Sequence, residues 1–147
     1  MQVLEQLRLA AGILALRMDS WQTVVTDLVQ SLTTMHDQSM HHLSCLLGLL
    51  TILPEVSTNK KLVVNHDRRE IYRRMLCEAA PQVVQVMLAV QTQCRAREDI
   101  MERMLTCATS WTRHIELPAD ELVHLMPMAC NSFAMGSMKL LDVAAEF

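Results

Sequence analysis

The 147-residue sequence is poor in the residues that build turns and sheets. It has 3 glycines, 4 prolines and only 3% aromatic residues, although 51% of its residues are hydrophobic. Sheet proteins need turn residues and runs of β-branched or aromatic residues, so this scarcity argues against a sheet. Leu, Val, Ala and Met carry the apolar content instead. The composition therefore predicts an all-α fold in a chain long enough to bury a core.

The sequence also has no CxxC or CxxH pair and no secretory signal pattern. Its five cysteines are odd in number and widely spaced: Cys45, Cys77, Cys94, Cys107 and Cys130. This pattern indicates reduced, buried cysteines in a cytosolic or nuclear protein. Glu5, Arg8 and Arg17 interrupt the opening stretch, which has helical periodicity and no cleavage-site pattern.

One long apolar stretch, HLSCLLGLLTILP from His42 to Pro54, carries no charge between Leu43 and Leu53. At ~1.5 Å rise per residue, a helix of this length is too short to cross a ~30 Å bilayer core. We expect a helix buried on most sides and ended by Pro54, because proline cannot continue the backbone hydrogen bonding. Such a helix is the expected middle layer of a stack.

Apolar residues at helical spacing predict further helices on both sides of this stretch. Before it, we expect helices over residues 2–18 and 21–33 and a polar connection over 33–39. After it, we expect a loop over 55–65 and a helix capped by Asn65 or Asp67 that runs to about residue 92, with a kink or break at Pro81. The next helices are expected from residues 95–98 to about 115–117, from Pro118 to Gly136 with a bend at Pro127, and over 138–147.

These helices group into antiparallel hairpins of the HEAT type, stacked in a right-handed α-α superhelix of about three and a half repeats. We expect hairpins at about 1–33, 38–92 and 96–134, followed by an unpaired helix over 137–147. A closed bundle of six or seven helices is the alternative. Neither end shows the polar outer face of a terminal repeat, so residues 1–147 are expected to be a single fragment of a longer array.

Four segments of the chain are distinctive, in this order: QLRLAAGILALRMDSWQTVVTDLV (Gln6 to Val29), LLGLLTILPEVS (Leu46 to Ser57), NHDRREIYRRM (Asn65 to Met75) and MLTCATSWTRHIEL (Met104 to Leu117). Together they resemble the N-terminal third of the transportin-SR and importin-thirteen branch of the importin-β superfamily (the karyopherins). Two departures from that pattern are Val56, where the family has a second glutamate, and Pro81, which interrupts the helix after the arginine-rich turn.

The resemblance implies a fragment, of roughly repeats three to six, of a nuclear transport receptor that shuttles between nucleus and cytoplasm. Such receptors bind Ran in its GTP form, carry protein cargo into the nucleus and contact phenylalanine–glycine nucleoporins. The transportin-SR members import serine/arginine-rich splicing factors. The alternative is a generic HEAT or armadillo-type interaction scaffold without Ran binding, and neither interpretation involves an enzyme, a membrane or a cofactor.

The net charge is only -3, but the basic residues cluster. The cluster comprises Lys60, Lys61, Arg68, Arg69, Arg73 and Arg74. Arg68, Arg69, Arg73 and Arg74 are the candidate partner-binding residues, expected on one broad side of a helix and facing an acidic protein surface. The alternatives are a solvated face and an ordering contact for the loop over residues 55–65. No aromatic stacking residues accompany the cluster, which argues against direct nucleic-acid binding.

Several groups of residues have the side-chain types of a chemical site. His41, His42 and Cys45 have helical spacing, with His36 as the only nearby addition, but a structural zinc ion needs four ligands. Cys107 with His114, or Cys130 with His124, has the residue types of a nucleophile and base. These cysteines are expected on packed faces, whereas catalytic cysteines need an exposed electropositive pocket. We therefore predict no metal and no catalytic site.

Trp21 and Trp111 each follow a serine beside an expected helix boundary. We expect both as wedges between repeats, with the indole N–H near the surface. A nucleoporin-binding slot is the alternative role. The abundant methionines suit a deformable helical array and are expected in the core.

Overall fold

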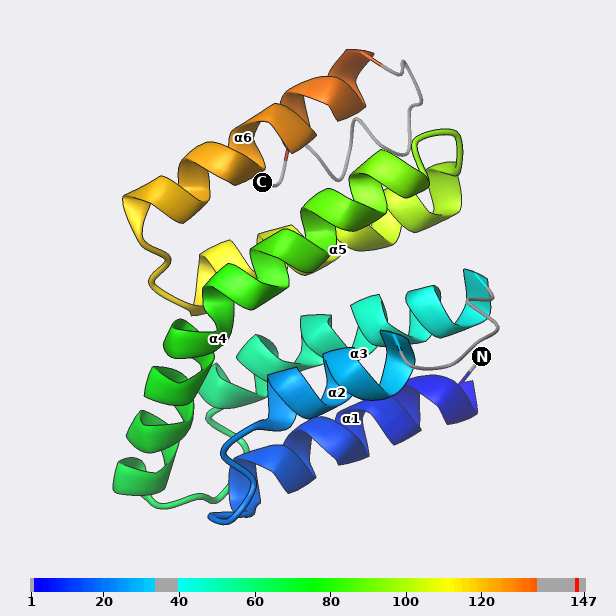
Figure 1. Cartoon of the computed structure of the whole chain (residues 1–147). Coiled ribbons are helices and arrows are strands. Elements are labelled where there is room, and N and C mark those ends of the chain that lie inside the picture. The colour runs from blue at the N-terminus through cyan, green and yellow to red at the C-terminus, as the bar shows by residue number, and fades with distance from the viewer. Residues whose placement is uncertain (1, 34–39, 135–144, 146–147) are drawn as a thin grey trace.

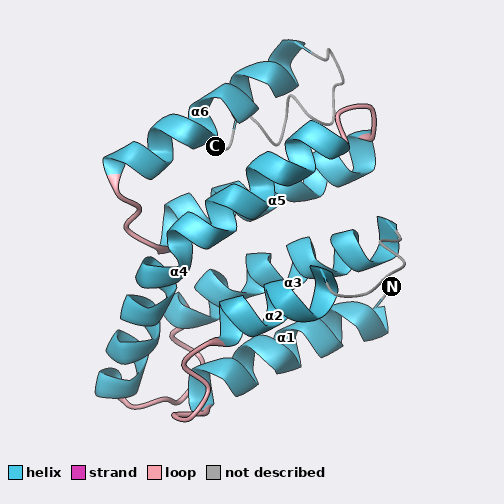
Figure 2. Cartoon of the chain, in the orientation of Figure 1, coloured by secondary structure: helices cyan, strands magenta, loops and turns pink. Residues whose placement is uncertain are grey.

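The computed structural model describes residues 2–33, 40–134 and 145, and this part of the chain consists of helices and their connections (Figures 1 and 2). It contains six helices: α1 (Gln2–Arg17), α2 (Val24–Thr33), α3 (Met40–Thr58), α4 (His66–Gln93), α5 (Glu98–His114) and α6 (Ala119–Ala134). The predicted helix over residues 137–147 lies, except for residue 145, outside the described residues.

The helices form two layers. In the first layer, α3 lies between α1 and α5 and makes its most extensive contacts with these two helices. In the second layer, α4 contacts both α2 and α6. Consecutive hairpins therefore stack with their first helices together and their second helices together, which confirms the all-α, HEAT-like fold (Figure 1).

The hydrophobic core runs through both layers without a break from Ala15 in α1 to Leu125 in α6. Leu47 and Leu50 of α3 are fully buried, as are Tyr72 and Met87 of α4 and Met104 of α5. Many of the remaining core residues are aliphatic. By length and composition α3 is long and apolar enough to cross a membrane, yet part of this helix is buried between its neighbours.

The prediction that Pro54 ends the central helix is wrong. Helix α3 continues to Thr58, so the connection to α4 is shorter than the loop expected over residues 55–65. Because Pro54 has no N–H, the carbonyl oxygen four residues earlier, on Leu50, lacks its intrahelical donor. The indole N–H of Trp111 in α5 donates to that oxygen at 2.9 Å.

Two further carbonyl groups of α3 near Pro54 receive side-chain donors from neighbouring helices. Ser110 of α5 donates its hydroxyl to the Thr51 oxygen at 2.8 Å, and Tyr72 of α4 donates to the Leu53 oxygen at 3.3 Å. The segment of α3 before the proline is thus bonded to both α5 and α4. The carbonyl group of Leu50, which loses its donor to Pro54, is satisfied by Trp111, and these two additional bonds hold the same segment against its neighbours.

Helix α4 begins where the sequence indicates. Asn65 is its N-cap, and the Asn65 side chain accepts a hydrogen bond from the Asp67 N–H at 3.2 Å. Helix α4 continues through Pro81 without interruption, so the predicted break does not occur. The ribbon of α4 does change direction along its length, as expected for a helix with an internal proline (Figure 1).

The start of α2 was predicted three residues too early. The helix begins at Val24 rather than Trp21. Asp27, in the first turn of α2, accepts hydrogen bonds from the Thr23 hydroxyl at 2.9 Å and from the Trp21 indole at 2.8 Å. These bonds hold Trp21 and Thr23 in the turn that precedes the helix.

Candidate partner-binding surface

Arg68, in the first turn of α4, binds the end of α1. Its guanidinium donates to the carbonyl oxygens of Leu16 at 2.8 Å and Ala15 at 3.1 Å, and also to that of Met18. Its Nε lies 3.0 Å from a carboxylate oxygen of Asp19. A helix leaves its last carbonyl groups without intrahelical donors, and Arg68 supplies donors for α1. The Arg68 side chain therefore joins two consecutive hairpins and is only 11% exposed.

The neighbouring Arg69 binds the end of α3 and the loop that follows. Its guanidinium donates to the carbonyl oxygens of Ser57 at 2.6 Å, Asn59 at 3.2 Å, Leu62 at 3.0 Å and Val56 at 3.4 Å. This is the ordering contact with the loop that was considered as one role of the basic cluster. Both arginines are thus occupied by backbone carbonyl groups of this chain, and their charge is partly neutralised by helix C-termini.

The remaining cations of the cluster are Lys60, Lys61, Arg73 and Arg74, which we call the basic surface, and two of them, Lys60 and Arg73, line one groove. Lys60, Lys61 and Arg74 are exposed and Arg73 is half-buried. Within the described residues, none of these four makes a hydrogen bond or ion pair through its side chain. The structure therefore divides the predicted cluster into two structural arginines and four cations whose charges remain available.

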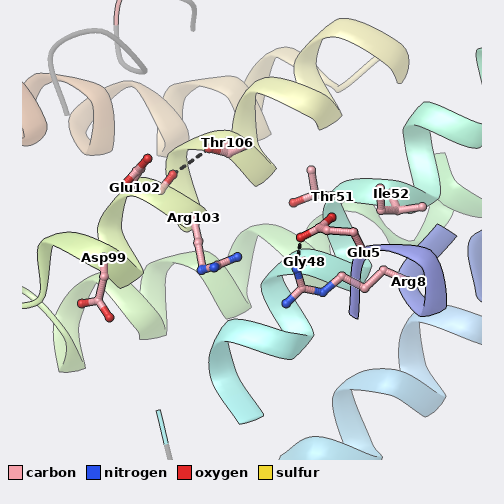
Figure 3. A pocket seen from close by; sticks show the side chains of 9 residues that line it. All are labelled: Glu5, Arg8, Gly48, Thr51, Ile52, Asp99, Glu102, Arg103 and Thr106. Carbon is pink, nitrogen blue, oxygen red and sulfur yellow. Dashed lines mark hydrogen bonds and ion pairs between the residues drawn. The ribbon is translucent and has the colours of Figure 1, made fainter. Parts of the chain in front are cut away.

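A second polar region lies among the three first-layer helices (Figure 3). A cavity of about 310 Å³ there is lined by Glu5 and Arg8 of α1, Gly48 of α3 and Arg103 of α5, among others. The Arg8 guanidinium donates to a Glu5 carboxylate oxygen at 2.7 Å and is 4% exposed. Figure 3 shows Arg103 extending into the gap between α5 and α3, while Asp99 points away from it.

Arg8 and Gly48 form a contact that sequence analysis missed. A Cβ atom at Gly48 would lie 2.5 Å from Arg8 Cζ, so any other residue at this position would force the guanidinium to move from its place against α3. Two sequence signals could have revealed this contact. Arg8 lies on the same helical face as buried Gly12 and Ala15, and Gly48 is a glycine within the most apolar helix. The lining combines two cations with three carboxylates, so the cavity favours no single ligand charge.

Trp111 is a wedge between repeats, as predicted, because its ring is 1% exposed between α5 and α3. The prediction that its N–H lies near the surface is wrong, since that group is buried on the Leu50 oxygen. Trp21 is half-buried and donates to Asp27 beside the start of α2. The methionines are expected in the core, and Met101 and Met104 are buried there, whereas Met126 is 56% exposed, which corrects that expectation for Met126.

The cysteine and histidine candidates do not form a nucleophile–base pair in the described residues. The imidazole Nδ1 of His114 lies 2.8 Å from the Thr58 hydroxyl, and burial raises the pKa of the Cys107 thiol to about 12. A thiol with that pKa is not a nucleophile at neutral pH. Cys130 and His124 are both exposed on α6, which corrects the expectation that Cys130 is buried on a packed face.

The histidines at the start of α3 do not form a metal site with other described residues. No group of three or more His, Cys, Asp or Glu side chains there has a suitable arrangement. His41 is exposed and Cys45 is half-buried, and His36 lies outside the described residues.

Comparison with known proteins gives the family. The model of the exportin 1-like protein family matches residues 1–147, which is the whole chain. No solved structure matches significantly. The family match agrees with the stacked two-layer helical hairpins described above. The chain belongs to the exportin 1-like family, within the importin-β/exportin superfamily of karyopherin-type nuclear transport receptors.

Proposed function

We propose that the chain is part of a receptor of the transportin-SR type, which binds Ran in its GTP form and carries protein cargo into the nucleus. The observation that carries this proposal is the exportin 1-like family match over residues 1–147. The four segments that resemble the transportin-SR and importin-thirteen branch supply the finer assignment. Serine/arginine-rich splicing factors are the proposed cargo class.

The internal contacts of the structure connect the four segments on which this finer proposal rests. Arg68 lies in the third resembling segment and binds carbonyl groups of the first, while Arg69 binds the end of the second. Trp111 and Ser110, from the fourth segment, bind the second. The four segments therefore form one connected bonding pattern across three hairpins.

The proposed receptor works by non-covalent binding and without catalysis. In this role it shuttles between nucleus and cytoplasm, with phenylalanine–glycine nucleoporins as further partners. Lys60, Lys61, Arg73 and Arg74 are exposed or half-buried and have no acidic partner among the described residues. We assign this basic surface to an acidic protein partner, since complementary charge speeds encounter and sets orientation.

The test is capture of Ran by the immobilised longer receptor that contains this chain. Ran loaded with a non-hydrolysable GTP analogue should be retained in preference to Ran loaded with GDP. Equal retention of the two forms, or none of either, would contradict the proposal. In that event a generic HEAT scaffold without Ran binding becomes the better description.

A further inference from the structure

An open groove lies between the end of α3 and the start of α4. It has a volume of about 470 Å³, and its lining includes Lys60, Leu62, Val63, Val64 and Arg73. The floor of the groove is held in place by Arg69, which donates to carbonyl oxygens on both sides of the turn. These bonds tie the end of α3 to the turn that follows it.

The charge of the groove has one sign. Its described lining contains lysine and arginine but no aspartate or glutamate. The Arg69 guanidinium is already bonded to backbone carbonyl groups, whereas Lys60 and Arg73 make no side-chain hydrogen bond or ion pair within the described residues. These two cations leave a site that attracts carboxylates.

The groove also carries an exposed apolar side chain. Val63 is 90% exposed, while Leu62 and Val64 on either side of it are half-buried and pack against the core. Its neighbours anchor the backbone so that the Val63 side chain points away from the core. A partner that covers Val63 gains apolar contact in addition to charge pairing.

The backbone beside Val63 has unused hydrogen-bonding capacity. Val63 and Val64 take part in no backbone–backbone hydrogen bond within the described part of the chain, and Asn65, which follows Val64, has polyproline II-like dihedral angles, φ -57° and ψ 141°. An extended peptide can pair with such a segment through its own N–H and C=O groups, as in peptide binding by strand addition.

We propose that this groove binds an extended acidic peptide segment with an aliphatic side chain at its centre. Carboxylates of the peptide pair with Lys60 and Arg73, and the aliphatic side chain packs on Val63. The inference rests on the proposed function, because it names the kind of segment that an acidic partner presents to the basic surface.

The test uses two fluorescein-labelled synthetic peptides, Asp-Glu-Asp-Leu-Asp-Glu-Asp and the same sequence with glycine in place of leucine. Fluorescence anisotropy with the 147-residue chain should show saturable binding of the leucine peptide. The glycine peptide should bind at least about threefold more weakly, because it cannot cover Val63. A labelled single-stranded RNA of equal charge is run in parallel as a polyanion without an aliphatic group.

Two variants and one control locate the site. The double variant K60E/R73E should weaken binding of the leucine peptide by about tenfold or more. V63D should remove the difference between the two peptides. R95E, a single charge reversal at the turn after α4, should leave binding unchanged. Circular dichroism melting checks that each variant is folded.

Three results would overturn the inference: unchanged binding in K60E/R73E, equal binding of the two peptides, or tighter binding of the RNA than of the leucine peptide. The outcome is separable from that of the Ran experiment. If Ran is not captured but the peptide binds, the proposed transport role is contradicted and the peptide-binding inference stands. If Ran is captured but the peptide does not bind, only the peptide-binding inference is contradicted.

Discussion

The indole N–H of Trp111 replaces the backbone donor that Pro54 cannot provide, because it bonds to the Leu50 carbonyl oxygen at 2.9 Å. A proline inside a buried helix leaves a carbonyl group without its donor, and burial makes that loss costly. Here the donor comes from α5, in the next repeat, so the carbonyl group that Pro54 leaves without a donor fixes the position of α5 against α3. Pro54 and Trp111 therefore form one structural unit.

Replacement of Trp111 by phenylalanine should destabilise the chain. The variant leaves the Leu50 carbonyl group buried without a donor, which costs about 1–3 kcal/mol of unfolding free energy, in addition to lost packing. Urea denaturation followed by circular dichroism measures the change. Trp21→Phe is the matched control and should cost less, because Trp21 is half-buried and its partner is the Asp27 side chain.

A double-mutant cycle separates the hydrogen bond from the loss of ring volume. Pro54→Ala restores an N–H group that can donate to Leu50, so W111F should cost about 1 kcal/mol less in a P54A background than in the parent chain. Additive effects of the two substitutions would show that the bond contributes nothing.

Removal of Arg69 should loosen the turn between α3 and α4. Arg69→Met keeps much of the aliphatic stem but loses four donor contacts to backbone carbonyl groups, which predicts a loss of about 1.5–3 kcal/mol. Arg69→Lys should recover only part of it, because an ammonium group cannot reproduce the planar guanidinium fork. The exposed Arg74→Met should change stability by less than about 0.5 kcal/mol. Equal losses for R69M and R74M would contradict the structural role of Arg69.

Glu55 should make stability depend on pH. Burial raises the pKa of its carboxyl group above 4.5, an effect that nearby His114 partly offsets. The folded chain therefore holds this proton more tightly than the unfolded chain does. The resulting stabilisation is full below about pH 4.5 and is lost as pH rises through the folded-state pKa.

The variant Glu55→Gln removes this titration. We expect it to raise the urea midpoint at pH 7 and to leave it close to that of the parent chain at pH 4. Exposed Glu78→Gln controls for the loss of one negative charge. A midpoint lowered at pH 7 by E55Q would show that the ionised carboxylate is favourable in the folded chain.

The cysteines should differ in reactivity. Cys130 is exposed, whereas Cys107 is fully buried and its pKa is raised to about 12 by that burial. Iodoacetamide at pH 8 should therefore modify Cys130 in the folded chain and Cys107 only after unfolding. Peptide mass spectrometry measures both rates, and equal rates would contradict the burial of Cys107.

The fold class and the layer order could be predicted from sequence because they depend on periodic local features. Scarce aromatic and turn residues indicated helices, the apolar run indicated the middle layer, and Asn65 marked the start of α4. These signals lie within one element and need no knowledge of its neighbours.

The roles of Pro54, Arg68 and Arg69 could not be predicted in the same way. Pro54 ends a helix on local rules, and only Trp111, 57 residues later in the chain, makes its position inside α3 acceptable. The arginines look like a solvated face until α1 and α3 place their free carbonyl groups beside them. Helix spacing specifies which side a residue is on, but it does not specify what lies there.

The transport-receptor assignment is tested most directly by the ratio of two dissociation constants for Ran, one in its GTP-analogue form and one in its GDP form. The assignment predicts that the GTP-analogue form binds at least about tenfold more tightly, which corresponds to about 1.4 kcal/mol. A ratio of one would contradict it.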